Sequence, residues 1–102
     1  MSSFRKRLQT KFRKVKKEYL KEHPYCEICL LEGVETPATD VHHIVARWDP
    51  DKFLDPNNLV ALCHLHHLML HQEAGTIVER ERVKKLLEIV IRRKNDKKRG
   101  EG

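Results

Sequence analysis

The chain of 102 residues has few aromatic residues, 6% of the total, and no long hydrophobic run. A membrane-spanning helix needs about 18 or more apolar residues in a row, so none is predicted and no membrane is expected as a partner. The polar, basic start over residues 1–21 lacks the apolar stretch of a secretory signal, which favours a cytoplasmic protein. With 39% hydrophobic residues the chain can build one small core, which a metal or a disulfide would help to stabilise.

Cysteine is also scarce, with only Cys26, Cys29 and Cys63. An odd number without an export signal is poorly explained by disulfides, so metal ligation is the better interpretation. Histidine, in contrast, is abundant: the chain has seven, and six of them lie between positions 42 and 71, on both sides of Cys63. This clustering favours metal chemistry in the centre of the chain.

Charge is unevenly distributed along the chain, whose net charge is +6. Residues 1–22 contain nine Lys and Arg against two Glu, a net +7, and residues 92–102 contain six against two acidic residues, a net +4. The middle is therefore acidic. Basic flanks suit a polyanionic partner, because Lys and Arg bind phosphates without regard to sequence. A solvated helix face with a disordered tail is the alternative, and charge alone does not separate the two.

The apolar pattern predicts a small α+β domain with a helix at each end. Spacings of three and four predict an amphipathic first helix, whose apolar stripe would pack most simply on the C-terminal helix, or on a second copy of the chain. A capping box at Thr76–Glu79 begins the last helix, which we expect to fray near Lys94. The expected elements are a helix over 3–21, strands over 40–46 and 59–62, a helix over 63–72, and the last helix from 76.

The chain shows no internal repeat and no linker long enough to divide it, so residues 1–102 are predicted to form one domain. Its parts are a basic N-terminal helix (1–22), a zinc-bearing core (23–75), a C-terminal helix (76–94) and a disordered basic tail (95–102).

The first candidate metal site combines Cys26-x-x-Cys29 with Cys63-x-x-His66. Two residues between ligands allow a tight turn to direct both side chains at one ion, and thiolates with an imidazole suit tetrahedral zinc. Four protein ligands predict a structural Zn²⁺ site that contributes to folding. His64 and His23 are alternative fourth ligands. A redox pair of Cys26 and Cys29, with Cys63 as a buried apolar residue, is the other interpretation.

The second candidate site combines His42 and His43 with Asn58, His67 and His71. Side chains four residues apart share one face of a helix, so His67 and His71 can address one ion. Adjacent residues of a regular strand point to opposite sides, although a distortion could aim both His42 and His43 into one cleft. An imidazole without a metal can take a proton from water. Alternatively, all of these histidines hold structural zinc.

In order along the chain, these residues resemble the HNH endonuclease family. Its ββα-metal motif has a histidine on the first strand, an asparagine in the connecting loop and a histidine on the helix. The matching segments are VHHIVARWD (41–49), DPNNLVALC (55–63) and HLHHLMLH (64–71). The resemblance covers residues 24–75 and extends to family members with a structural zinc, which implies a ββα-metal fold with a zinc knuckle.

The resemblance implies a role for each matching residue. His43 matches the general base, and Asn58 matches the asparagine that ties the loop to the backbone around the base. His67 matches the helix ligand of the catalytic ion, His42 stands at another ligand position, and His71 matches an additional ligand of the colicin-type members. The implied ion is a divalent metal such as Mg²⁺, Mn²⁺, Ni²⁺ or Zn²⁺.

The function implied by this resemblance is metal-dependent hydrolysis of DNA phosphodiester bonds, by nicking or double-strand cleavage, in a monomer or a homodimer. A non-catalytic zinc-binding nucleic-acid module and an accessory factor of a phage packaging machine are the alternatives. DNA would be held mainly by its phosphates. The candidate contacts are Arg5, Lys6, Arg7, Lys11, Arg13, Lys14 and Arg47.

Overall fold

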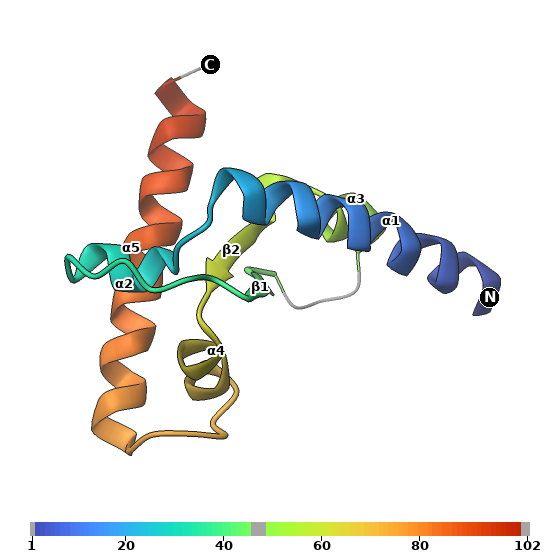
Figure 1. Cartoon of the computed structure of the whole chain (residues 1–102). Helices are drawn as coiled ribbons and strands as arrows, with labels where there is room; N and C mark the ends of the chain where they lie inside the picture. The colour runs from blue at the N-terminus through green and yellow to red at the C-terminus, as the bar shows by residue number, and fades with distance from the viewer. Residues whose placement is uncertain (1, 46–48, 101–102) are drawn as a thin grey trace.

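Two short antiparallel strands and the helix that follows them form the centre of the computed structural model (Figure 1). Strand β1 (Asp40–His43) pairs with β2 (Leu59–Leu62), and Asp40 lies opposite Leu62. Helix α4 (His64–Leu70) begins two residues after β2, with Cys63 as its N-cap. The strands and α4 together form a ββα unit.

The structure describes residues 2–45 and 49–100, so Arg47 lies outside the described residues. It has the predicted α+β class, with a helix at each end of the chain. Strand β1 is shorter than the strand predicted over 40–46, because the N–H of Val45 donates to the side-chain oxygen of Asn58 and not to a strand partner. No helix in these described ranges is long and apolar enough to cross a membrane.

Helix α1 (Ser2–Glu22) packs on one face of the two strands. Its apolar stripe packs on the strands and not, as predicted, on the C-terminal helix, because alternate side chains of both strands offer an apolar face to it. Tyr19 also meets the C-terminal helix, through Lys94. Among the stripe residues whose side chains are described, Leu8 and Tyr19 are buried and Phe12 and Val15 are half-buried. This layer contains Tyr19, Val41, Leu59 and Ala61, with Phe12, Val15, Leu20 and Ala38 at its edge.

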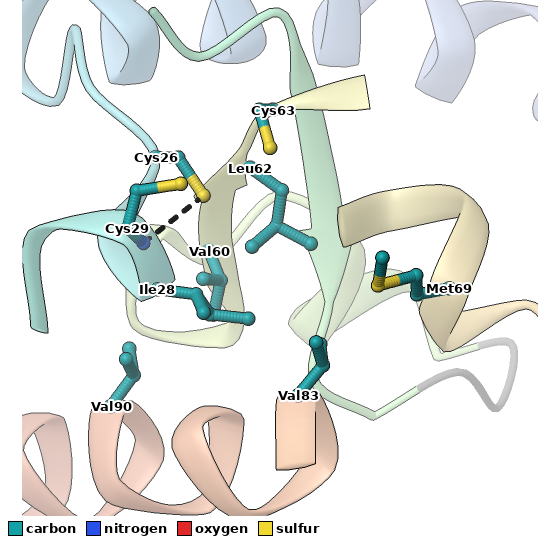
Figure 2. Close-up of a cluster of buried hydrophobic side chains, with 9 residues drawn as sticks. All are labelled: Cys26, Ile28, Cys29, Val60, Leu62, Cys63, Met69, Val83 and Val90. Carbon is teal, nitrogen blue, oxygen red and sulfur yellow. Dashed lines mark hydrogen bonds between the residues drawn. The ribbon is translucent and has the colours of Figure 1, made fainter. Parts of the chain in front are cut away.

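The opposite face of β2 packs against α5 (Ile77–Gly100) and α2 (Glu27–Leu31), two helices that also contact each other. Both faces of β2 are therefore covered, which explains why all four of its residues are apolar and buried. Figure 2 shows this core, whose apolar members are Ile28, Val60, Leu62, Met69, Val83 and Val90.

The capping box predicted for the last helix is present. The amide of Glu79 donates to the Thr76 hydroxyl at 3.1 Å, and the amide of Thr76 donates to the Glu79 carboxylate at 3.2 Å. The predicted end near Lys94 is wrong, because α5 continues to Gly100, and so is the predicted disorder for residues 95–100. Their polar composition suggested a disordered tail, yet Lys and Arg are good helix formers and no breaker precedes Gly100.

Two short helices, α3 (Pro50–Phe53) and η1 (Pro56–Asn58), connect the strands. Each begins with a proline at its first position after an aspartate N-cap, Asp49 or Asp55, whose carboxylate accepts an amide two residues later. Proline lacks the N–H that would be unsatisfied there, and the aspartate satisfies the next one. This sequence chemistry fixes the conformation of residues 49–58 before β2.

A half-buried polar network joins α1, α2 and α5. The Tyr19 hydroxyl lies 2.7 Å from a Glu27 carboxylate oxygen, which also accepts the amide of Ala61 at 2.7 Å. The Lys94 ammonium donates to the Tyr19 oxygen at 2.7 Å and lies 3.2 Å from the other Glu27 oxygen. Because a buried charge is costly unless it is paired, the network fixes how these helices meet.

Candidate functional site

The three cysteines and His66 form one cluster at the edge of the core. Their ligand atoms all lie within 4.8 Å of one another, and Nδ1 of His66 is 3.4 Å from the Cys26 sulfur and 3.5 Å from the Cys29 sulfur. In Figure 2 the three sulfur atoms gather beside β2 and the first turn of α2. The cluster therefore joins the turn before α2 to the start of α4, as predicted.

The donor set of this cluster fits zinc. Burial raises the pKa of the Cys29 thiol to about 12 and lowers the pKa of His66, so the His66 ring is neutral and the Cys29 thiol keeps its proton unless a cation replaces it. Three sulfurs and one imidazole nitrogen are a common tetrahedral set for Zn²⁺. Cys26, Cys29, Cys63 and His66 could thus hold a structural zinc.

The alternative fourth ligands have other partners. His64 is on the exposed side of α4, where its Nδ1 lies 3.0 Å from a carboxylate oxygen of Asp40. His23 stacks on the ring of Tyr19 at 4.3 Å between centroids. Of the three histidines that the spacing left open, His66 is the one whose ring lies with the cysteine sulfurs.

A second cluster lies on the other side of α4, where the rings of His42, His67 and His71 converge. Their ligand atoms lie within 4.8 Å of one another, and the two Nε2 atoms of His67 and His71 are 3.1 Å apart. Burial, with His67 and His71 nearby, lowers the pKa of His42 to about 4, so this imidazole is neutral at neutral pH. Three imidazole nitrogens suit a divalent transition metal and leave further positions for water or substrate.

Asp40 is a member of this site that the sequence reasoning missed. One of its carboxylate oxygens lies 2.7 Å from Nδ1 of His67 and 3.0 Å from Nδ1 of His64. Burial opposes ionisation, yet hydrogen bonds from both rings and from Thr39 lower the pKa of Asp40 to about 2. Asp40 precedes His42 by two positions on the same strand, which is the only signal in the sequence that could have found it.

His43 lies outside this cluster, on the face of β1 that meets α1. Its ring packs 4.8 Å from that of Phe12 and stacks on that of Phe53 at 4.9 Å between centroids. The ring is half-buried, and its Nε2 lies 3.1 Å from the Phe53 carbonyl oxygen. His42 and His43 therefore diverge as alternation in a strand requires, and the distortion that would aim both into one cleft is not seen in this strand.

Asn58 links the loop segments around His43. Its side-chain oxygen accepts the amide of Val45 at 2.9 Å, and its side-chain nitrogen donates to the carbonyl of Lys52 at 3.1 Å. Lys52 directly precedes Phe53, the residue whose carbonyl meets His43. With only 7% of its surface exposed, Asn58 is the buried polar residue among those described.

The basic residues of α1 predicted to meet phosphates are exposed where the structure describes their side chains, at Lys6, Arg7, Lys11, Arg13 and Lys14. Arg5 lies in the same helix, but its side chain is outside the described part. Phe12, on the inner face of this helix, touches His43. The basic helix thus runs beside the candidate base.

A ββα unit whose helix carries part of a histidine cluster and part of a Cys₃His cluster is consistent with a ββα-metal domain that has a zinc site. Comparison with family models agrees with this class. Residues 26–73 match the HNH endonuclease family, so the chain contains an HNH endonuclease domain over that segment. A search of curated proteins and of solved structures gives no match.

Proposed function

We propose that the protein is a metal-dependent endonuclease that hydrolyses phosphodiester bonds of DNA. One observation carries the proposal: His42, His67 and His71 converge on one point, while the next imidazole on the strand, His43, stays outside their cluster. A nuclease of this type needs both a ligand set for a cation and a separate base. A purely structural metal site would have no use for the separate base.

His43 is the proposed general base. A carbonyl oxygen only accepts, so the contact with Phe53 requires the proton to be on Nε2 and leaves the lone pair on Nδ1. Nδ1 would take a proton from a water molecule as its oxygen attacks phosphorus in line with the 3′-oxygen. The new oxygen–phosphorus bond forms while the bond to the 3′-oxygen breaks, and that oxygen takes a proton from solvent. The products would carry a 5′-phosphate and a 3′-hydroxyl.

A divalent ion held by His42, His67 and His71 would stabilise negative charge on the phosphoryl and leaving oxygens. Asn58 is assigned a positioning role, because it fixes the loop whose Phe53 carbonyl orients the base. The buried Cys₃His cluster is assigned to structural zinc, which holds α4 and hence two of the three ion ligands in place.

DNA is proposed to bind along α1. The exposed Lys and Arg of this helix neutralise phosphates, and the contact between Phe12 and His43 puts the helix next to the base. Such contacts hold a duplex without reading its sequence. Binding should therefore weaken steeply as the salt concentration rises.

The test is incubation of the purified protein with supercoiled plasmid and Mg²⁺, Mn²⁺, Ni²⁺ or Zn²⁺, with and without a chelator. Relaxed or linear plasmid that disappears on chelation is the expected result. A plasmid unchanged with all four ions would overturn the nuclease and favour a non-catalytic zinc module that only binds nucleic acid. Metal stoichiometry separates the two, because a nuclease should hold one tight zinc and a second, exchangeable ion.

A further inference from the structure

We propose that Asp40 is a positioning residue that fixes the tautomer of His67 and thereby sets the affinity of the three-histidine cluster for its ion. The inference rests on the ion site of the proposed function and adds a residue to it. Its basis is the 2.7 Å contact between a carboxylate oxygen of Asp40 and Nδ1 of His67. Asp40 itself lies outside the set of converging ligand atoms.

The strand pairing explains why this carboxylate reaches α4. Asp40 begins β1 and pairs with Leu62, the last residue of β2, and the chain enters α4 two residues later. The amide of Thr39 donates to the carbonyl of Leu62 at 3.0 Å and fixes this end of the ladder. Asp40 also lies on the same face of β1 as His42. The carboxylate and the strand ligand of the cluster therefore approach α4 together.

The carboxylate is itself held in place. The Thr39 hydroxyl donates to one of its oxygens at 2.8 Å, while the other oxygen faces both His64 and His67. Because the side chain of Asp40 is 19% exposed and that of His67 is 25% exposed, solvent only partly competes for this contact. His64 is 69% exposed, so its bond to the same oxygen is the weaker restraint.

The contact decides which ring nitrogen of His67 carries the proton. A carboxylate oxygen accepts and a neutral imidazole has one N–H, so the proton belongs on Nδ1. Nε2 then keeps its lone pair, and this nitrogen is the one that lies 3.1 Å from Nε2 of His71. The opposite tautomer would direct an N–H into the cluster, where it would exclude a cation. Outer partners of this kind typically change metal affinity by about 10- to 100-fold when removed.

The experiment compares Asp40→Ala and Asp40→Asn with the wild-type chain, with His64→Ala as the matched control. The control removes the other ring on the same oxygen and leaves the contact with His67. Each protein is purified with one equivalent of zinc, and its affinity for added Ni²⁺ is measured by competition with a chromophoric chelator. Long-range ¹H–¹⁵N NMR of the histidine rings, recorded before nickel is added, reports the tautomer of His67.

Asp40→Ala should bind Ni²⁺ about 10- to 100-fold more weakly and show a mixture of His67 tautomers. Asp40→Asn keeps an acceptor oxygen and should lose less Ni²⁺ affinity than Asp40→Ala. The Ni²⁺ affinity of His64→Ala should stay within twofold of wild type. Wild-type affinity in Asp40→Ala, an unchanged tautomer, or an equal loss in His64→Ala would overturn the inference. If Asp40→Ala does not fold, as judged by its zinc content, Asp40→Asn carries the same comparison.

These outcomes are separable from those of the nuclease proposal. A wild-type protein that leaves plasmid intact, yet binds Ni²⁺ in a manner that depends on Asp40, would overturn the nuclease and keep the inference. If the wild-type protein cleaves plasmid and its Asp40→Ala variant binds Ni²⁺ with wild-type affinity, the nuclease proposal stands and the inference about Asp40 is overturned.

Discussion

The carbonyl oxygen of Phe53 lies 3.1 Å from Nε2 of His43, and the rings of the same two residues stack with an interplanar angle of 5°. The stacking fixes the plane of the imidazole, and the hydrogen bond fixes which nitrogen carries the proton. Nδ1 is left as the basic nitrogen. His43 is therefore held in one orientation and one tautomer without contacting the metal cluster, as a base requires.

His43→Ala should abolish cleavage and leave ion binding and DNA binding nearly unchanged. Loss of a general base typically lowers the rate by about 10²- to 10⁴-fold. Plasmid cleavage, metal content and a DNA-binding titration measure the three properties. The exposed His64 is a matched control, since His64→Ala removes an imidazole from the same ββα unit and should keep the rate. Full activity in His43→Ala would remove this residue from the role of base.

Asn58→Ala should lower both the cleavage rate and the stability. The substitution leaves the amide of Val45 and the carbonyl of Lys52 without their partner, which costs about 1–3 kcal/mol for buried groups. Because the loop then holds the Phe53 carbonyl less firmly, kcat should fall more than KM changes. Urea unfolding and cleavage kinetics give the two quantities. A variant that loses stability but keeps kcat would make Asn58 a structural residue only.

His71→Ala should weaken the exchangeable ion without destabilising the fold. The side chain is exposed at the end of α4, so the free energy of unfolding should change by less than about 0.5 kcal/mol. Loss of a ligand should cost at least as much affinity as the about 10- to 100-fold lost with an outer partner. Isothermal titration calorimetry with Ni²⁺ measures this affinity. Unchanged affinity would mean that His42 and His67 hold the ion without His71.

Cys29→Ser should prevent folding of the domain. Structural zinc supplies about 10–16 kcal/mol of binding free energy in small zinc domains, which is comparable with the whole stability of a domain of this size. Zinc content by mass spectrometry and a thermal unfolding curve by circular dichroism measure the effect. A variant that lacks zinc and yet unfolds cooperatively at the wild-type temperature would show that the cluster does not need a metal.

Tyr19→Phe should change how stability depends on pH. Burial and the neighbouring Glu27 carboxylate raise the pKa of Tyr19 well above its ordinary value. The folded state therefore keeps a proton that the unfolded state loses above roughly pH 10, and the free energy of unfolding falls as pH rises beyond that point. The variant should lose about 1 kcal/mol at neutral pH and decline less steeply at high pH. Urea unfolding of both proteins at neutral pH and above pH 10 gives these free energies. An equal fall with pH in wild type and Tyr19→Phe would contradict the expectation.

Local features of this protein could be predicted from the sequence because each depends on residues a few positions apart. The capping box at Thr76–Glu79 and strand β2 follow from such spacings, and both are confirmed. The convergence of His67 with His71 follows from one turn of helix. The Cys₃His set was less certain because the spacing allowed several histidines, and only the packing of α4 selects His66.

Contacts between distant segments that share no metal-ligand pattern could not be predicted, because they depend on strand register and helix packing. Asp40 meets His67 only through the pairing of β1 with β2, and the side chains of Tyr19 and Lys94 are 75 positions apart. The covering of the α1 stripe by the strands belongs to the same group, since a stripe shows that a helix face is buried but not what buries it. The contact of His43 with Phe53 uses the backbone carbonyl, so the identity of the residue at position 53 gives no indication of it.

His66 and His67 are neighbours on the seven-residue helix α4, yet one ring meets the cysteine sulfurs and the other meets the imidazoles. Two candidate metal sites therefore share a single helix less than two turns long. A strong sequestering agent that withdraws zinc would also scatter the imidazoles, so lost cleavage in its presence would not identify which ion was taken. Chelators of increasing strength are therefore needed, and cleavage should be measured again as each metal is added back. This series distinguishes loss of the ion at the three histidines from unfolding of the domain.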